Sequence, residues 1–145
     1  MKKIFLSVLI LFTTFSYSQS LRSVNIDSYK YIVIDEVSGG KIKETRRFLV
    51  KNLQKAGYNV INLNNPLKTY DKFPEDLEEN PNLGIYLTFN TEARFSGYET
   101  LMILYSYGNK ELFRRSNTSG SLLSKAIKNT ISSLTSYNYR YIEDW

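Results

Sequence analysis

The sequence predicts an α+β domain, a two-layer sandwich in which two helices cover one face of a mixed, mostly antiparallel sheet. Short runs rich in β-branched and aromatic residues alternate with two stretches of helical apolar spacing. The first strand, helix and strand follow one another through short connections, as in a right-handed parallel βαβ unit. Turn signals then join three alternating strands into a meander. The expected element order is β-α-β-β-β-β-α.

The βαβ unit is expected over residues 29–63. Residues 29–37 (YKYIVIDEV) have the composition of a strand and stop at Ser38-Gly39-Gly40. Residues 41–56 carry apolar side chains at helical spacing with Lys and Arg on the other side, and Gly57 follows where a left-handed C-cap is favoured. Residues 58–63 (YNVINL) predict the second strand.

The rest of the chain supplies the meander and the second helix. Residues 64–82 hold all three prolines and an acidic cluster, which predicts a long loop with one helical turn near residues 76–79. Strands are expected over 83–94, 98–107 and 111–116, joined by tight turns at Ser96-Gly97 and Gly108-Asn109. Residues 121–134 predict a helix, and the alternating tail 137–141 is expected either to add an edge strand or to lie along the sheet.

The N-terminus has the pattern of a secretory signal peptide. Met1-Lys2-Lys3 precedes an apolar run over residues 4–12, and small residues at Ser16 and Ser18 suit signal peptidase. We expect a signal peptide over 1–18, a lead segment over 19–28 and a single α+β domain over 29–145. The predicted location is periplasmic or secreted, without a transmembrane segment in the mature chain. Because the chain has no Cys, it has no lipidation site at the cleavage point and no disulfide.

Composition narrows the chemistry. Without His and Cys, the usual ligands of zinc, copper and haem are missing, as is an imidazole base for triad-type hydrolysis. The net charge of +5 falls to +3 when Lys2 and Lys3 leave with the signal, which is too mild for a nucleic-acid footprint. We therefore expect no cofactor, no metal, no nucleic-acid partner and no enzymatic activity.

Three polar clusters are the candidates for a catalytic, phosphate-binding or metal-binding site. Asp35 and Glu36, at the end of the first strand, are residue types used in glycoside hydrolysis or cation binding, but strand neighbours point to opposite faces. The Ser38–Lys41 connection offers backbone N–H groups at a helix start, without the spacing of a known phosphate motif. The acidic residues 75–79 lack the alternating ligands of a calcium loop.

Tyrosine is unusually frequent, with twelve residues in the chain. An amphipathic ring suits a binding surface, and it also suits the half-exposed face of a sheet. Tyr105 and Tyr107 share one face of their strand, as do the tyrosines of the first strand and those of the tail. The residues predicted to contact a partner are Tyr29, Tyr31, Tyr86, Tyr137, Tyr139 and Tyr141.

Four segments carry a resemblance to a known family: KYIVIDEV, LVKNLQKAGYNVINL, LMILYSYGNKELFRRSN and SLLSKAIKNTISSL. Their order of elements over residues 29–134 resembles the small periplasmic α/β domain at the N-terminus of TolB, also found in curli-secretion-type lipoproteins. The resemblance implies a non-catalytic domain that contacts other proteins of the bacterial cell envelope. This chain departs from the lipoprotein members in lacking the lipidated cysteine.

These observations predict an exported, non-enzymatic cell-envelope domain that binds a protein partner through an open sheet face and a Tyr-rich tail. The alternative is a small exported hydrolase that depends on carboxylates such as Asp35 or Glu36, or a protein that binds glycans or small ligands. A third hypothesis is an immunity-like or adaptor protein. A pocket with two converging carboxylates would favour the enzyme, whereas an aromatic face would favour the binding domain.

Overall fold

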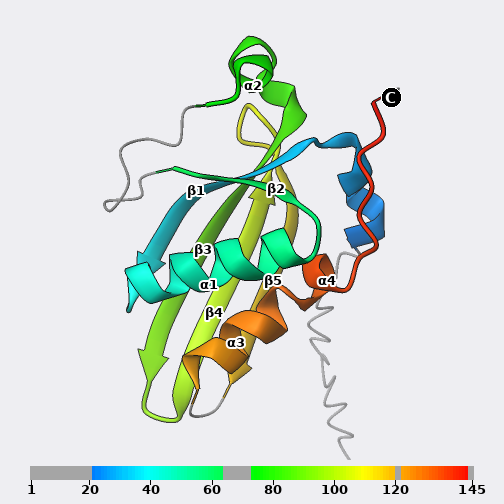
Figure 1. The fold of residues 1–145 in the computed structure, drawn as a ribbon. Coiled ribbons are helices and arrows are strands. Elements are labelled where there is room, and N and C mark those ends of the chain that lie inside the picture. Colours follow the sequence, from blue (N-terminus) through cyan, green and yellow to red (C-terminus); the bar gives the residue numbers. More distant parts are fainter. Residues whose placement is uncertain (1–20, 64–72, 120–121, 144–145) are drawn as a thin grey trace, which may run out of the picture.

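The computed structural model describes residues 21–63, 73–119 and 122–143, which contain one five-stranded sheet of order β2-β1-β3-β4-β5 (Figure 1). The strands are β1 (Tyr31–Gly39), β2 (Asn59–Asn62), β3 (Gly84–Arg94), β4 (Gly97–Tyr105) and β5 (Glu111–Ser119). β1 runs parallel to both β2 and β3, whereas β3, β4 and β5 form an antiparallel meander. The predicted α+β fold with a mixed sheet is confirmed. The predicted signal peptide lies outside the described residues.

Helices cover one face of this sheet. α1 (Ile42–Lys55) and α3 (Leu123–Thr130) cross that face side by side, and α4 (Ser132–Thr135) follows α3 (Figure 1). The short helix α2 (Glu75–Glu79) includes the predicted helical turn, and single 3-10 turns occupy Leu21–Val24, Ile26–Ser28 and Pro81–Leu83. Across the described ranges, no helix is long and apolar enough to cross a membrane.

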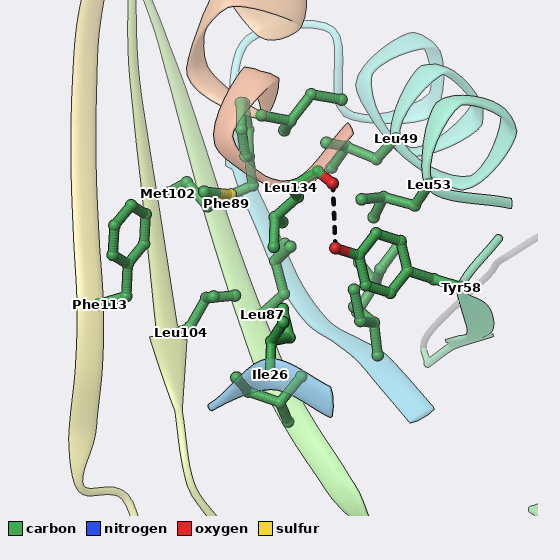
Figure 2. Packing of buried hydrophobic residues seen from close by; sticks show 14 of the residues in the cluster. Ile26, Leu49, Leu53, Tyr58, Leu87, Phe89, Met102, Leu104, Phe113 and Leu134 are labelled. Carbon is green, nitrogen blue, oxygen red and sulfur yellow. Dashed lines mark hydrogen bonds between the residues drawn. The ribbon is translucent and has the colours of Figure 1, made fainter. Parts of the chain in front are cut away.

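The main core lies between the sheet and the covering helices, because alternate residues of β3 and β4 face α1 and α3 (Figure 2). Ile32, Ile34 and Val37 of β1 belong to the same core. Its members are almost completely buried, among them Leu49 and Leu53 of α1, Phe89 of β3 and Met102 of β4. Tyr58 points into the same core and donates a hydrogen bond of 3.0 Å from its hydroxyl to the backbone oxygen of Leu134 (Figure 2). That bond ties the start of β2 to α4.

A second, smaller cluster lies on the opposite face of the sheet. Leu77 of α2 is buried against Val33 of β1 and Ile61 of β2. Polar contacts support it, since Asp76 pairs with the Lys30 ammonium and accepts a 3.0 Å hydrogen bond from the Tyr31 hydroxyl. α2 therefore covers the β1–β2 side of this face.

The segment before β1 and the C-terminal tail pack against each other. They lie side by side in Figure 1, and the Ile142 N–H donates to the Asp27 backbone oxygen at 3.0 Å. Leu21 and Ile26 are buried in the main core. The lead segment thus contributes to the domain, and the tail lies along that segment without forming a strand.

The closing helix is one element in the sequence prediction and two in the structure. Ile131, with φ −86° and ψ 2°, separates α3 from α4. The Thr130 hydroxyl donates back to the Ala126 oxygen at 2.9 Å, and the Ser132 hydroxyl to the Asn129 oxygen at 2.8 Å. Such local side-chain bonds and the β-branched pair Thr130-Ile131 weaken a continuous helix at this point.

The connection from β1 to α1 is fastened to the end of β3. Gly39 adopts φ +88°, and a Cβ there would lie 1.8 Å from the Thr91 backbone oxygen. The Gly40 N–H donates to that oxygen at 2.9 Å, while the Thr91 hydroxyl donates to the Gly40 oxygen at 2.6 Å. Only glycine fits this close approach of two backbones.

Candidate functional site

On the face of the sheet opposite α1 and α3, no described helix covers β3, β4 or β5. We call this part of the sheet the open face. The strand register fixes which side chains stand together there, since Tyr86 of β3 lies directly opposite Tyr105 of β4. The next row places Thr88 opposite Ile103, and Ile103 opposite Arg114 of β5. Cross-strand neighbours at this spacing contact one another, so these rows form one continuous surface.

This surface is hollowed near the turn between β4 and β5. The hollow has a volume of about 670 Å³. We call it the tyrosine hollow, and its lining consists of Asp35, Tyr86, Thr88, Tyr105, Ser106, Tyr107, Gly108 and Asn109. Three aromatic rings, one carboxylate and several small polar groups therefore meet at one place on the open face.

The tyrosine rings differ in how firmly they are held. Tyr86 is half-buried, and its hydroxyl donates a long hydrogen bond of 3.4 Å to the Pro81 backbone oxygen. Burial raises the pKa of Tyr86, and the neighbouring Tyr107 and Asp35 add to that rise. Tyr107 is 57% exposed, with its ring centre 6.2 Å from that of Tyr86 at a tilt of 40°. Tyr86 thus forms the base of an aromatic pair whose outer ring meets solvent.

The carboxylate of the hollow is placed by an irregularity in β1. Ile34 pairs with Leu87 and Glu36 pairs with Thr88, so Asp35 is an extra residue in a β-bulge. The sequence argument placed Asp35 and Glu36 on opposite faces, and that prediction is wrong. Because the bulge interrupts the alternation, both side chains are exposed and stand on the open side, but Asp35 alone of the two lines the hollow.

Two arginines near this site are already engaged, whereas Lys110 of the β4–β5 turn is exposed and forms no ion pair among the described residues. Arg114 of β5 donates from Nε and Nη2 to the two carboxylate oxygens of Glu111, at 3.0 and 2.8 Å. Arg46 of α1 donates to Asn62 Oδ1 at 2.7 Å and to the Leu63 backbone oxygen at 2.6 Å. Burial lowers the pKa of Arg46, and the negative charges of Asp35 and Glu36 oppose that shift. Within the described part of the chain, no Lys or Arg forms an ion pair with Asp35.

The six tyrosines predicted to bind a partner separate into two groups. Tyr86 lines the hollow, and Tyr31 stands on the same face beside α2 with its hydroxyl on Asp76. The others lie away from the hollow, at the lead segment and the tail: Tyr29, Tyr137, Tyr139 and Tyr141.

Two of the three tail tyrosines, Tyr137 and Tyr139, are part of the internal packing. The Tyr139 ring stacks on Tyr58 with centres 4.5 Å apart, and its hydroxyl donates to the Tyr29 backbone oxygen at 2.7 Å. The Tyr137 hydroxyl donates to Asp27 at 2.8 Å. Burial raises the pKa of Tyr139 to about 12. Tyr29, Tyr137 and Tyr139 all pack against the main core, which gives them a structural role.

Tyr105 and Tyr107 complete the hollow but were absent from the predicted contact residues. Their shared strand face was visible in the sequence, because they are two residues apart. The position of Tyr105 opposite Tyr86 depends on the hairpin register, and the predicted turn at Ser96-Gly97 is wrong by one residue. The contribution of Asp35 depends on the β-bulge in β1, which no pattern in the sequence indicates.

The other polar clusters have partners of their own. The Gly40 N–H, proposed as part of a phosphate site, already donates to Thr91. In the acidic segment, Asp76 contacts Lys30 and Tyr31, and the Lys30 hydrogen bond lowers the pKa of Asp76. A search of the described residues finds no group of three or more acidic side chains arranged to hold a metal ion.

Comparison with known proteins gives no match to a family model, to a curated protein or to a solved structure. The resemblance to the TolB-type domain therefore stays a prediction, and the function has to be argued from the hollow itself.

Proposed function

We propose that this chain is an exported, non-enzymatic domain of the cell envelope that binds a protein partner through the open face of its sheet. The contact surface is centred on the tyrosine hollow. The observation that carries this proposal is the meeting of Tyr86, Tyr105 and Tyr107 on the part of the sheet face, over β3–β5, that no described helix covers.

The residue types of the hollow favour recognition of a partner. Tyrosine is enriched at the centres of protein interfaces because it offers a large rigid contact area and a polar hydroxyl. Ser106 and Asn109 supply polar groups at the rim. Carboxylate-dependent hydrolysis needs two acidic groups within reach of one bond, and Asp35 is the one carboxylate among the lining residues. The binding function therefore fits this lining better than the hydrolase does.

The surface excludes the tail, in contrast to the expectation from the sequence. Tyr137 and Tyr139 already use their hydroxyls within the chain. Removing them would weaken the fold and thereby any binding, so loss of binding in a tail variant would not identify a contact residue.

Affinity capture from an envelope extract tests the proposal. The wild type, Tyr107→Ala and Phe95→Ala are compared, with captured proteins quantified by mass spectrometry. Phe95 is a matched control because it is a fully exposed aromatic residue at the β3–β4 turn, outside the hollow. We expect Tyr107→Ala to lose a protein that both the wild type and Phe95→Ala retain. Equal capture by all three, or loss in Phe95→Ala alone, would contradict the proposal.

Export is tested separately. Cells expressing the full chain should yield a periplasmic or secreted form whose N-terminal residue is Gln19. Recovery of the protein from the cytosol with residues 1–18 attached would overturn this part of the proposal.

A further inference from the structure

We propose that the tyrosine hollow receives a cationic side chain, lysine or arginine, of the partner protein. This inference rests on the proposed function and specifies its chemistry. Aromatic faces attract cations through the negative potential above the ring, and an adjacent carboxylate strengthens that attraction. The hollow combines Asp35 with the rings of Tyr86, Tyr105 and Tyr107.

The same chemistry operates elsewhere on this face of the protein. The Lys30 ammonium lies 5.4 Å from the centre of the Tyr31 ring and pairs with Asp76. That hydrogen bond with Asp76 raises the pKa of Lys30. Lys30 adjoins Tyr31 in the chain, so this ammonium is also held by the backbone. The hollow brings together the same two types of group, with three rings and one aspartate.

The charges around the hollow favour a cation over an anion. Arg114, which lies near Tyr105, is held by both oxygens of Glu111, and this pairing offsets its positive charge. Arg46 is bound to Asn62 and Leu63 on the side of the sheet that carries α1. An anionic ligand would therefore meet the Asp35 carboxylate, and none of the described lining residues is basic. Lys110, an exposed residue of the adjacent β4–β5 turn, is the nearest basic residue in sequence to that lining.

Titration with small cations tests this inference on the protein purified from cells expressing the full chain. The probes are n-butylguanidinium and n-butylammonium, with n-pentanol as a neutral control of similar length. Binding is followed by NMR of selectively labelled tyrosine rings. We expect saturable shifts at Tyr86, Tyr105 and Tyr107 with the cations, and affinity at least about fivefold weaker for the alcohol. Equal affinity for the alcohol would overturn the inference.

Neighbouring carboxylates provide matched variants. Asp35→Asn should weaken cation binding by about fivefold or more, since it removes the charge that lines the hollow. Glu36→Gln, which changes an exposed carboxylate outside the lining, should alter it by less than about twofold. Equal effects of both variants would show long-range attraction only and would contradict a specific site.

Further outcomes separate this inference from the proposed function. N-acetylglucosamine is titrated in parallel, and shifts with the sugar but not with the cations would mean a glycan site and overturn the inference. If no probe binds while Tyr107→Ala still loses its captured protein, the cation hypothesis fails and the partner-binding function stands. If cations bind and capture is unaffected by Tyr107→Ala, the hollow binds a free cation and the partner proposal fails.

Discussion

Replacing Tyr139 by alanine should destabilise the domain more than replacing Tyr107 by alanine, although each tyrosine contacts one other aromatic ring. Tyr139 stacks on Tyr58 and bonds to the Tyr29 backbone oxygen, whereas Tyr107 is 57% exposed. We expect Tyr139→Ala to destabilise the domain about twice as much as Tyr107→Ala. The contrast tests the division of the tyrosines into structural and binding groups.

The size of the effect follows from the contacts of Tyr139. A half-buried tyrosine removes about 100 Å² from water, which contributes about 2.5 kcal/mol. Stacking on Tyr58 adds about 0.5–1 kcal/mol, and the hydrogen bond to Tyr29 about 1 kcal/mol. Tyr139→Ala should therefore lower the free energy of unfolding by about 4 kcal/mol. Tyr107 is 57% exposed and so withholds about 90 Å² from water, and by the same measure Tyr107→Ala should lower the free energy of unfolding by no more than about 2 kcal/mol.

Urea unfolding followed by circular dichroism at 222 nm measures both variants. Tyr139→Phe serves as a control, since it keeps the stacked ring and loses only the hydroxyl, and should cost about 1 kcal/mol. A Tyr139→Ala variant as stable as the wild type would refute the assignment of the tail to the core. So would a larger loss in Tyr107→Ala than in Tyr139→Ala.

Three further perturbations test the fold. Gly39→Ala should lower the free energy of unfolding by more than about 4 kcal/mol, because its Cβ would meet the Thr91 backbone oxygen. Gly57 also has a positive φ but lies in open space, so Gly57→Ala should lower it by about 1 kcal/mol. Equal Tm values for the two variants would contradict this. Thr130→Val removes the buried hydroxyl that lies 2.5 Å from the hydroxyl of Thr100, and it should lower the free energy of unfolding by about 1–2 kcal/mol. Thermal unfolding measures this, and an unchanged Tm would contradict it. The folded state holds the Tyr139 proton more tightly, with a pKa of about 12 against about 10 in the unfolded chain, so stability should be lost as the pH rises from 10 to 12. Urea unfolding at pH 9 and pH 11 should show a smaller loss in Tyr139→Phe than in the wild type, and an equal loss would exclude Tyr139 as the cause.

The order and type of the elements could be predicted because local patterns determine them. The period-two alternation of β3 and the helical spacing in α1 are strong signals that tertiary contacts did not override. The split between α3 and α4 was missed, because the apolar spacing continues through Ile131 while side-chain hydrogen bonds interrupt the backbone.

The site was harder to predict because it depends on register. A turn at Ser96-Gly97 would put Tyr86 opposite Tyr107, whereas the observed turn at Phe95-Ser96 puts Tyr86 opposite Tyr105. The bulge that turns Asp35 toward the hollow arises from the pairing of β1 with β3, which are far apart in sequence. Alternation along one strand predicts which side chains share a face of the sheet, but it does not predict how that strand is aligned with its neighbour.

The role of the tail depends on a long-range contact as well. Alternating tyrosines indicate an exposed strand as readily as a packed segment. The tail contacts Asp27 and Tyr58, which lie far from it in sequence. Nothing in the local sequence around these two residues indicates those contacts.

Site-specific photo-crosslinking in living cells is the most direct test of the open face as the contact surface. Benzoylphenylalanine is placed at Ser116, which is exposed on the open face, and separately at Lys43 on α1 and at Tyr141 in the tail. The account predicts a discrete crosslinked protein from Ser116 alone, and its loss when Tyr107→Ala is introduced. A crosslink from Lys43 or Tyr141 without one from Ser116 would contradict it.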